Sequence, residues 1–241
     1  MNTLLLKIVR SVLDPAFERE YIPKNPHGWF ESQREEEPDI DPLSFDEMLG
    51  LLAALPELKW VHFYTVAFGT GLRPSEQFAL QWHHVDFKRK ILLIRQGFVN
   101  GRLTLLKTRG SKRDVDMLPS VQKALEKHRE ETQGKGLYVF SNLEGGPLHR
   151  DNIRNRIWNP ALAWAGLRHR NPYQTRHTFA SLMLQQGEDP AWVARMLGHT
   201  TTRMLYERYA RFIRNRKMQD GIRFEDELHK ARERRDGENR P

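Results

Sequence analysis

Residues 172–211 restrict the fold more than any other part of this 241-residue chain. Gly187 and Gly198 divide the stretch into three short helices, because glycine commonly ends a helix. Asp189 can cap the middle helix, and the proline that follows it suits a first-turn position. His199 comes directly after the second glycine, so its side chain is free to point into a cleft.

The charge balance indicates a polyanionic partner. Lysine and arginine number 39 against 31 aspartate and glutamate, which gives a formal net charge of +8 and a pI near 9.8. A basic balance of this size favours nucleic acid. The chain has no cysteine, which excludes disulfides, thiolate catalysis and cysteine-based zinc sites.

The apolar residues predict a location inside the cell. Leu4, Leu5 and Leu6 form the longest apolar run near the start, and Lys7 and Arg10 interrupt it, so no secretory signal is expected. No stretch approaches the roughly 20 apolar residues of a membrane-spanning helix. We therefore expect a soluble, cytoplasmic protein with no membrane partner.

Hydrophobic periodicity predicts a mainly helical chain with one small antiparallel sheet. Ser44 and Glu47 form a capping-box pattern, and Asn100-Gly101 is a two-residue hairpin signal. The predicted helices cover residues 3–20, 44–55, 58–69, 74–80, 121–131 and 151–165, and the predicted strands cover residues 91–98, 102–106 and 114–118. The side chains expected to face inward from the last of these helices are Ile153, Ile157, Leu162 and Trp164.

Changes in composition mark the boundaries of the chain's parts. Residues 31–42 are acidic and contain proline, which is typical of an extended linker. A new folded unit is expected to begin near Leu43, and the sequence becomes mostly charged beyond Asp220. A single amphipathic helix precedes the linker. Because one helix cannot bury its own apolar stripe, we expect it to dock on another surface.

Arg176, His199 and a tyrosine form a set suited to phosphodiester chemistry. Near a helix start, an arginine and free backbone N–H groups both favour a phosphate, and a guanidinium can hold two nonbridging oxygens at once. Tyr206 and Tyr209 are three residues apart, so they share one helix face. A phenol with a pKa of about 10 is a weak nucleophile at neutral pH, and neighbouring cations favour its phenolate.

Two cations upstream can complete this set. Arg73 lies in TGLRPSEQ, at a glycine-induced helix break where a side chain can face a cleft. Lys107 ends the second strand of the hairpin. From there a lysine can reach into a duplex and donate a proton to a departing 5′ oxygen.

Five sequence blocks occur in a characteristic order: TGLRPSE, LLKT followed by RDV, YQTRHTFA, RMLGHT and RYARF. Their order and spacing resemble those of the tyrosine recombinases, specifically the phage-type integrases, over roughly residues 42–224. The resemblance implies an α+β, mainly α fold: an integrase-type catalytic domain of several helices with a small three-stranded antiparallel sheet. It also implies a reaction without metal, nucleotide or other cofactor.

The resemblance implies a role for each residue singled out above in a site-specific DNA recombinase or integrase. Arg73 and Arg176 clamp the scissile phosphate, and Lys107 acts as general acid. His199 hydrogen-bonds a nonbridging oxygen. Tyr209 is the nucleophile and leaves a 3′-phosphotyrosyl link and a free 5′ hydroxyl. Because one phosphate ester replaces another of similar energy, rejoining needs no ATP.

Two further site residues and the choice of nucleophile follow from the same resemblance. The family usually has histidine three residues before the second arginine, where this chain has Tyr173. Tyrosine can hydrogen-bond there, but it is no general base near pH 7 unless strongly perturbed. Glu76 matches the family's acidic residue after the first arginine and is expected to orient site groups. Tyr209 is chosen over Tyr206 because RYARFIRN resembles the family's ending, which leaves Tyr206 on a packing position.

The resemblance also implies a domain organisation and partners. Residues 1–41 are expected to be the remnant of a core-binding domain, reduced to one helix plus an acidic linker, residues 42–228 the catalytic domain, and residues 229–241 a charged tail. A full integrase holds DNA between its core-binding and catalytic domains, and this chain is expected to have only the second. Because affinity depends on the number of phosphate contacts, the chain should bind DNA more weakly than a full integrase. The expected partners are double-stranded DNA and further copies of the chain, assembled as a tetramer on DNA in a prokaryotic or phage setting.

Two other functions fit parts of the sequence. QQGEDPAWVARMLGHTT fits a helix-turn-helix, which would make the chain a non-enzymatic DNA-binding regulator. That function does not require Arg73 or Lys107, and their matching context weighs against it. A chain of the same fold can also be an inactive remnant of a mobile element.

Overall fold

The computed structural model describes residues 3–26, 40–99, 101–106, 110–132, 136–212, 225–226 and 228–230. The chain forms two compact units, Met1–Asp39 and Ile40–Pro241. In the first unit, α1 (Thr3–Glu18) confirms the predicted N-terminal helix, and its apolar side chains Ile8, Val12 and Phe17 are exposed. Among the described residues, no helix combines the length and the hydropathy that crossing a bilayer demands.

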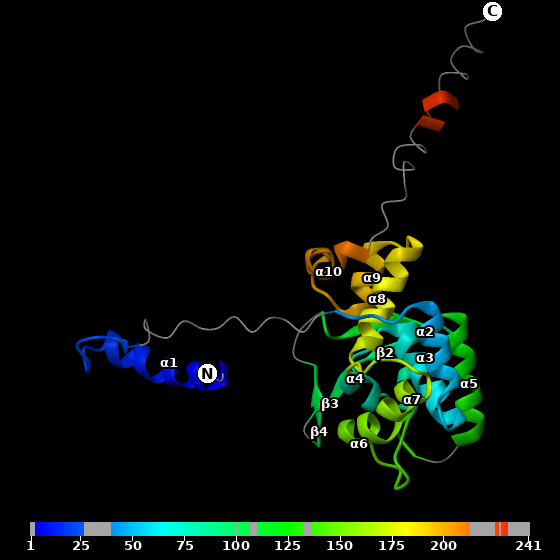
Figure 1. Cartoon of the computed structure of the whole chain (residues 1–241), viewed down its shortest axis with the longest axis horizontal. Coiled ribbons are helices and arrows are strands. Elements are labelled where there is room, and N and C mark those ends of the chain that lie inside the picture. The colour runs from blue at the N-terminus through cyan, green and yellow to red at the C-terminus, as the bar shows by residue number, and fades with distance from the viewer. Residues whose placement is uncertain are drawn as a thin grey trace, which may run out of the picture. The chain divides into compact units, whose positions relative to one another are not determined.

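Helix α3 (Leu58–Thr70) is the central element of the second unit. It packs against α5 (Pro119–Thr132) and α8 (Gln174–Gln186), and most of its residues are buried because apolar side chains occur on every face. Figure 1 shows α8, α9 and α10 at one end of this unit and α6 and α7 at the other. The remaining helices are α2 (Phe45–Ala53), α4 (Pro74–Phe78), α6 (Arg150–Ile153), α7 (Asn159–Trp164), α9 (Pro190–Leu197) and α10 (Thr202–Tyr209), with short 3₁₀ turns at Trp82–His84 and Ala210–Phe212.

The small antiparallel sheet that the sequence predicted has three strands, in the order β1-β2-β5. β2 (Ile91–Ile94) lies in the centre and pairs with β1 (Val85–Asp86) on one side and β5 (Arg113–Asp116) on the other. The fold is therefore α+β and mainly α, which confirms the predicted fold class.

The strand expected over residues 91–98 divides at Arg95. Its second half, β3 (Gln96–Val99), forms a separate two-stranded hairpin with β4 (Arg102–Leu105). The division arises because β5 runs beside the first half only, and their pairing ends at Ile94. The expected membership of the sheet is therefore wrong: β4 lies outside it, and the unpredicted β1 supplies the third strand.

The helix expected over residues 151–165 contains a π-helical turn. Residues Arg154–Trp158 form this turn between α6 and α7, next to Pro160, which has no backbone N–H to donate. A π turn holds one residue more than an α turn and rotates the side chains that follow it. Trp158 is consequently buried, whereas Trp164 is 68% exposed. The expected inward position of Trp164 is wrong.

The predicted helix caps at Ser44, Gly187, Asp189 and Gly198 are confirmed, whereas α4 ends at Phe78, two residues before the predicted end. Ser44 Oγ accepts a hydrogen bond from the Glu47 amide at 3.1 Å, and the Glu47 carboxylate accepts one from the Ser44 amide at 2.8 Å, which completes the capping box. The Asp189 side chain caps α9. Gly187 and Gly198 have φ values of 86° and 71°, in the left-handed region. Residues 172–211 therefore contain three short helices.

Gly71 connects α3 to the segment that carries Arg73. Its φ is +63°, and a Cβ atom added there would lie 2.6 Å from Phe179 Cδ1 and 2.8 Å from Leu197 Cδ2. Both the backbone conformation and the close approach of two buried side chains therefore require glycine.

We predict that Gly71→Ala lowers the free energy of unfolding by about 2–5 kcal/mol, because left-handed backbone costs about 1–2 kcal/mol and overpacking about 1–3 kcal/mol. Urea unfolding measures this change. Gly50→Ala is the matched control: Gly50 lies within α2, with no atom within 4 Å of an added Cβ. It should raise stability by about 0.5–1 kcal/mol. Equal midpoints for the two variants would show that Gly71 is not constrained.

Candidate active site

Arg73 and Glu76 lie at the start of α4. Arg73 is the N-cap residue, and the Glu76 carboxylate accepts hydrogen bonds from the Arg73 amide at 2.9 Å and from Arg73 Nη1 at 2.7 Å. The Glu76 side chain is 1% exposed, and the Arg73 side chain is 33% exposed. Burial alone would lower the pKa of Arg73, but Glu76 and the neighbouring Tyr173 hydroxyl outweigh burial and raise it.

Arg113 at the start of β5 binds the same carboxylate. Its Nη1 and Nη2 donate to the two Glu76 oxygens at 3.0 and 2.9 Å, and its Nε donates to the Met196 carbonyl oxygen at 2.6 Å. Burial would raise the pKa of Glu76, but the hydrogen bonds and charge of Arg113, with the charge of Arg73, lower it to about 2. Glu76 is therefore an ionised carboxylate held between two arginines.

Arg176 in α8 is buried beside this group. Its Nη1 donates to the Gly71 carbonyl at 2.8 Å, and its Nη2 donates to the Leu197 carbonyl at 2.6 Å. Burial, with the charges of Arg73 and Arg113, lowers the pKa of Arg176 to about 10. Arg73 and Arg113 share the Glu76 carboxylate, and Arg113 and Arg176 bind the adjacent Met196 and Leu197 carbonyls, so the three arginines lie together.

His199 lies next to this group of arginines. It follows Gly198 at the end of α9, where its amide donates to the Ala194 carbonyl at 2.9 Å. Its Nδ1 is buried, and it has no hydrogen-bond partner among the described residues. Burial lowers the pKa of His199 to about 4, and Arg176 and Arg73 add to this effect. His199 is therefore neutral at pH 7 and close to both predicted phosphate-binding arginines.

Tyr209 ends α10 with its hydroxyl 2.6 Å from Nδ1 of His177. Tyr209 is 1% exposed and packs in the core, whereas Tyr206 is 45% exposed. The expected packing position of Tyr206 is therefore wrong: Tyr209 is the tyrosine that faces the core, where it contacts His177 of α8. Burial raises the pKa of Tyr209 to about 12, against the opposing charges of Arg176 and Arg208.

Tyr173 lies immediately before α8 and connects the two halves of the site. Its hydroxyl is close enough to the Arg73 guanidinium to raise the pKa of that arginine, and its ring meets the His177 ring edge-on with centroids 5.2 Å apart. The structure thus brings Arg73, Tyr173, Arg176, His199 and Tyr209 into one neighbourhood, together with Glu76.

Lys107 lies outside the described residues. The chain is described again from Gly110, three positions later, where a Cβ atom would lie 2.9 Å from Thr200 Cγ2 and 3.4 Å from the Gly198 carbonyl oxygen. Gly110, which follows Lys107 by three residues, therefore packs against the turn that contains His199.

Two hollows that include basic side chains in their linings lie beside these groups, and the lining of the first is mostly apolar. One of about 520 Å³ is bordered by Arg73 and Tyr173 and also by Arg150 and Arg154 of the neighbouring helical segment. The other, of about 340 Å³, includes His199 in its lining, and its basic members are Lys112, Arg113 and Arg195. Such surfaces attract phosphate groups.

Arg113 and His177 belong to the site, although neither was predicted from the sequence. For Arg113 a signal was available: with Val115 and Met117 it forms an alternating series, and residues two apart in a strand share a face. A charge on the buried face of a strand requires a buried partner. Nothing in the sequence distinguishes His177 from a core histidine.

Known proteins resemble this chain in sequence. The profile of the Phage integrase family matches residues 43–216. IntQ of Escherichia coli (strain K12), a protein named as defective, is 30% identical over 221 residues, which cover 80% of this chain and 55% of IntQ. Prophage integrase IntR of the same strain is 30% identical over 237 residues, which cover 86% of this chain and 56% of IntR. The chain therefore spans about half the length of these relatives.

Solved structures resemble the fold. The Tn1549 transposon integrase in complex with a circular intermediate DNA aligns with a TM-score of 0.72 at 19% identity, covering 92% of this chain and 77% of that one. A lambda integrase dimer bound to a COC′ core site aligns with a TM-score of 0.63 at 18% identity, covering 83% of this chain and 72% of that one. With its family profile matched over residues 43–216, this chain belongs to the phage integrase family of tyrosine recombinases.

Proposed function

We propose that this chain is the catalytic domain of a site-specific DNA recombinase that breaks and rejoins DNA strands through a 3′-phosphotyrosyl intermediate. The observation that carries the proposal is the meeting of Arg73, Arg176 and His199 beside one buried phenol, that of Tyr209. Cations fixed in a partly dry site stabilise the charge that develops on a pentavalent phosphorus.

In this mechanism the two arginines hold the scissile phosphate. A guanidinium has five N–H donors, so Arg73 can bind Glu76 and Tyr173 and still donate to a phosphate oxygen. Two backbone carbonyls fix Arg176, so it needs no reorganisation when the phosphate gains charge. His199 is neutral and donates to a nonbridging oxygen. Lys107 protonates the departing 5′ oxygen, and Tyr209 attacks the phosphorus.

His177 positions Tyr209 in the resting site and does not ionise it. The pKa of His177 is lowered to about 4, chiefly by burial, and that of Tyr209 is raised to about 12. Because the pKa of Tyr209 lies far above that of His177, the phenol keeps its proton. Attack therefore requires the Tyr209 hydroxyl to leave His177 and approach the guanidinium groups, whose charge favours the phenolate. The phenolic proton passes to water as the oxygen bonds to phosphorus, and the bond from phosphorus to the 5′ oxygen breaks as that oxygen takes a proton from Lys107.

Double-stranded DNA is the proposed substrate, and self-association on DNA is part of the proposal. The net charge of +8 and the basic hollows support a DNA partner, and a solved relative is a lambda integrase tetramer bound to a Holliday junction. We assign residues 42–228 to the catalytic domain, residues 1–41 to the remnant of a core-binding domain with its linker, and residues 229–241 to a charged tail. We place the reaction in the cytoplasm of a prokaryotic cell.

One alternative has its own support: a chain of this family that has lost activity, since IntQ is named as defective. The helix-turn-helix regulator is less consistent with the site. Such a regulator needs neither a buried carboxylate between two arginines nor an arginine 2% exposed in α8.

We predict a covalent protein–DNA adduct on nicked suicide duplexes, presented as a labelled pool of candidate core sequences and resolved on denaturing gels. Tyr209→Phe should abolish the adduct, because it removes only the attacking oxygen. Tyr206→Phe is the matched control and should retain it. An adduct lost only in Tyr206→Phe would identify the other tyrosine as nucleophile. Binding to DNA without an adduct in any protein would favour the inactive chain.

We predict that Glu76→Gln lowers the free energy of unfolding by about 3–5 kcal/mol, because it leaves the buried Arg113 guanidinium without its charge partner. The variant should also weaken adduct formation. Glu207→Gln is the matched control, since it removes an exposed ion pair with Arg203 and should leave the urea midpoint unchanged. A small effect of Glu76→Gln on stability would show that Arg113 does not depend on this carboxylate.

We predict that stability falls as the pH is lowered from about 6.5 to about 4, because histidine in the unfolded chain takes up protons in this window. His177 and His199, each with a folded pKa of about 4, remain neutral there. Urea unfolding at a series of pH values checks the slope. His177→Asn, whose amide oxygen can still accept from Tyr209, should reduce it, and His199→Asn should reduce it independently. Wild-type slopes in both variants would contradict the prediction.

A further inference from the structure

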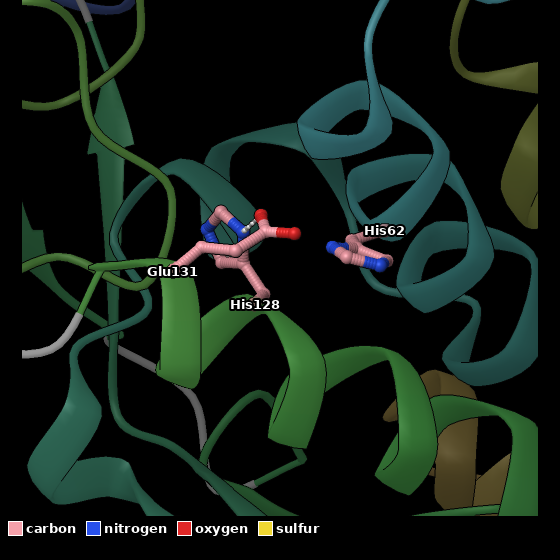
Figure 2. A group of neighbouring side chains, drawn as sticks. All are labelled: His62, His128 and Glu131. Carbon is pink, nitrogen blue, oxygen red and sulfur yellow. Dashed lines mark ion pairs between the residues drawn. The ribbon is translucent and has the colours of Figure 1, made fainter.

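A second cluster, of side chains that can ligate a metal ion, lies between α3 and α5. His62 comes from α3, and His128 and Glu131 come from α5, one turn apart. Each offers a nitrogen or oxygen atom, and these atoms all lie within 4.8 Å of one another. Figure 2 shows the Glu131 carboxylate between the two imidazole rings. None of the three residues borders either hollow beside the arginines.

The hydrogen bonds of His128 fix which of its nitrogens is available. Nε2 lies 2.8 Å from the Val139 carbonyl oxygen, and a carbonyl can only accept, so Nε2 carries the proton. Nδ1 therefore presents a lone pair. It is buried, without a hydrogen-bond partner among the described residues, and so is Nδ1 of His62. Two unpaired ring nitrogens in a core are costly and point to a missing partner.

The electrostatics of the cluster suit a cation of the zinc class. His62 and His128 are 4% and 1% exposed, and the contact of His128 Nε2 with the Val139 carbonyl leaves the Nδ1 lone pair available to a cation. Glu131 is 43% exposed and supplies one negative charge, its Oε2 lying 3.9 Å from His128 Nδ1. Neutral imidazole and carboxylate are ligands of Zn²⁺, and a backbone carbonyl behind a ligating histidine is a common support.

We propose that His62, His128 and Glu131 bind a divalent transition-metal ion such as Zn²⁺, which ties α3 to α5. At ligand distances of about 2.0–2.2 Å, tetrahedral ligand atoms lie about 3.3–3.6 Å apart. The ligand atoms now lie within 4.8 Å of one another, so binding requires both a change of the exposed Glu131 rotamer and a closer approach of the two imidazole rings. The ion is structural: it takes no part in the phosphoryl transfer, for which the sequence predicts no metal.

The ion would act on the site indirectly. α3 ends at Thr70, directly before the Gly71 carbonyl that accepts from Arg176. An ion that links α3 to α5 therefore restricts the motion of α3, the helix that leads directly into Gly71 and Arg73. Lys59 and Lys127 are the cations close enough to act on these histidines, and their charge opposes a bound cation.

Isothermal titration calorimetry tests the proposal: ZnCl₂ is titrated into the full chain after its metal has been removed with EDTA and the EDTA has been removed. No DNA is present, so the outcome is independent of the recombinase proposal. We expect one ion per chain, and Co²⁺ in its place should give visible absorption typical of nitrogen and oxygen ligands. Glu131→Gln should weaken Zn²⁺ binding about tenfold or more. Because Glu131 is exposed, this variant should fold, and circular dichroism checks that it does.

Two controls decide the location of the ion. Glu130→Gln changes the neighbouring exposed carboxylate on α5 and should leave the affinity unchanged, whereas His62→Gln should weaken binding as Glu131→Gln does. Absence of binding would overturn the proposal. So would binding that survives both ligand changes and disappears in His83→Gln, because that result would place the ion on the adjacent surface pair His83 and His84.

Discussion

The buried carboxylate of Glu76 is the interaction on which the arrangement of the site depends. It accepts hydrogen bonds from Arg73 and Arg113, and Arg113 continues to the Met196 carbonyl at the end of α9. Taking a carboxylate out of water costs several kcal/mol, and two guanidinium groups offset that cost here. Apolar packing can bring α4, β5 and α9 together, but it leaves side-chain directions open. This charge network fixes them.

The carboxyl end of α9 is held in the same way by two arginines from distant segments. Arg113 donates to Met196, and Arg176 donates to Leu197. The last carbonyls of a helix have no partner within it and carry partial negative charge, so guanidinium groups satisfy them well. His199 follows two residues after Leu197. Its position is consequently set by the same arginines whose charges act on it.

The sequence predicted what depends on local pattern and missed what depends on contacts between distant segments. Glycine, Asp189 and the Ser44 capping box identified the helix ends, because capping is decided within a few residues. At Arg95 the chain passes from pairing with β5 to pairing with β4, and a π turn precedes Trp164. Both depend on which strand or helix lies alongside, and hydrophobic periodicity does not show which neighbour that is. Within the site, resemblance supplied Arg73 and Arg176, whereas the contact of His177 with Tyr209 required the fold.

Gly110 and Gly198 bring two backbones into direct contact. A Cβ atom on Gly198 would lie 2.7 Å from the Gly110 carbonyl oxygen, so no side chain fits between the segments. One segment follows Lys107 and the other precedes His199. Segments in such contact cannot shift independently, so displacement of either backbone at this point displaces the other. The segment at Gly110 and the turn at Gly198 are in this way mechanically coupled. Larger residues at these two glycines would force the two backbones apart and remove the coupling.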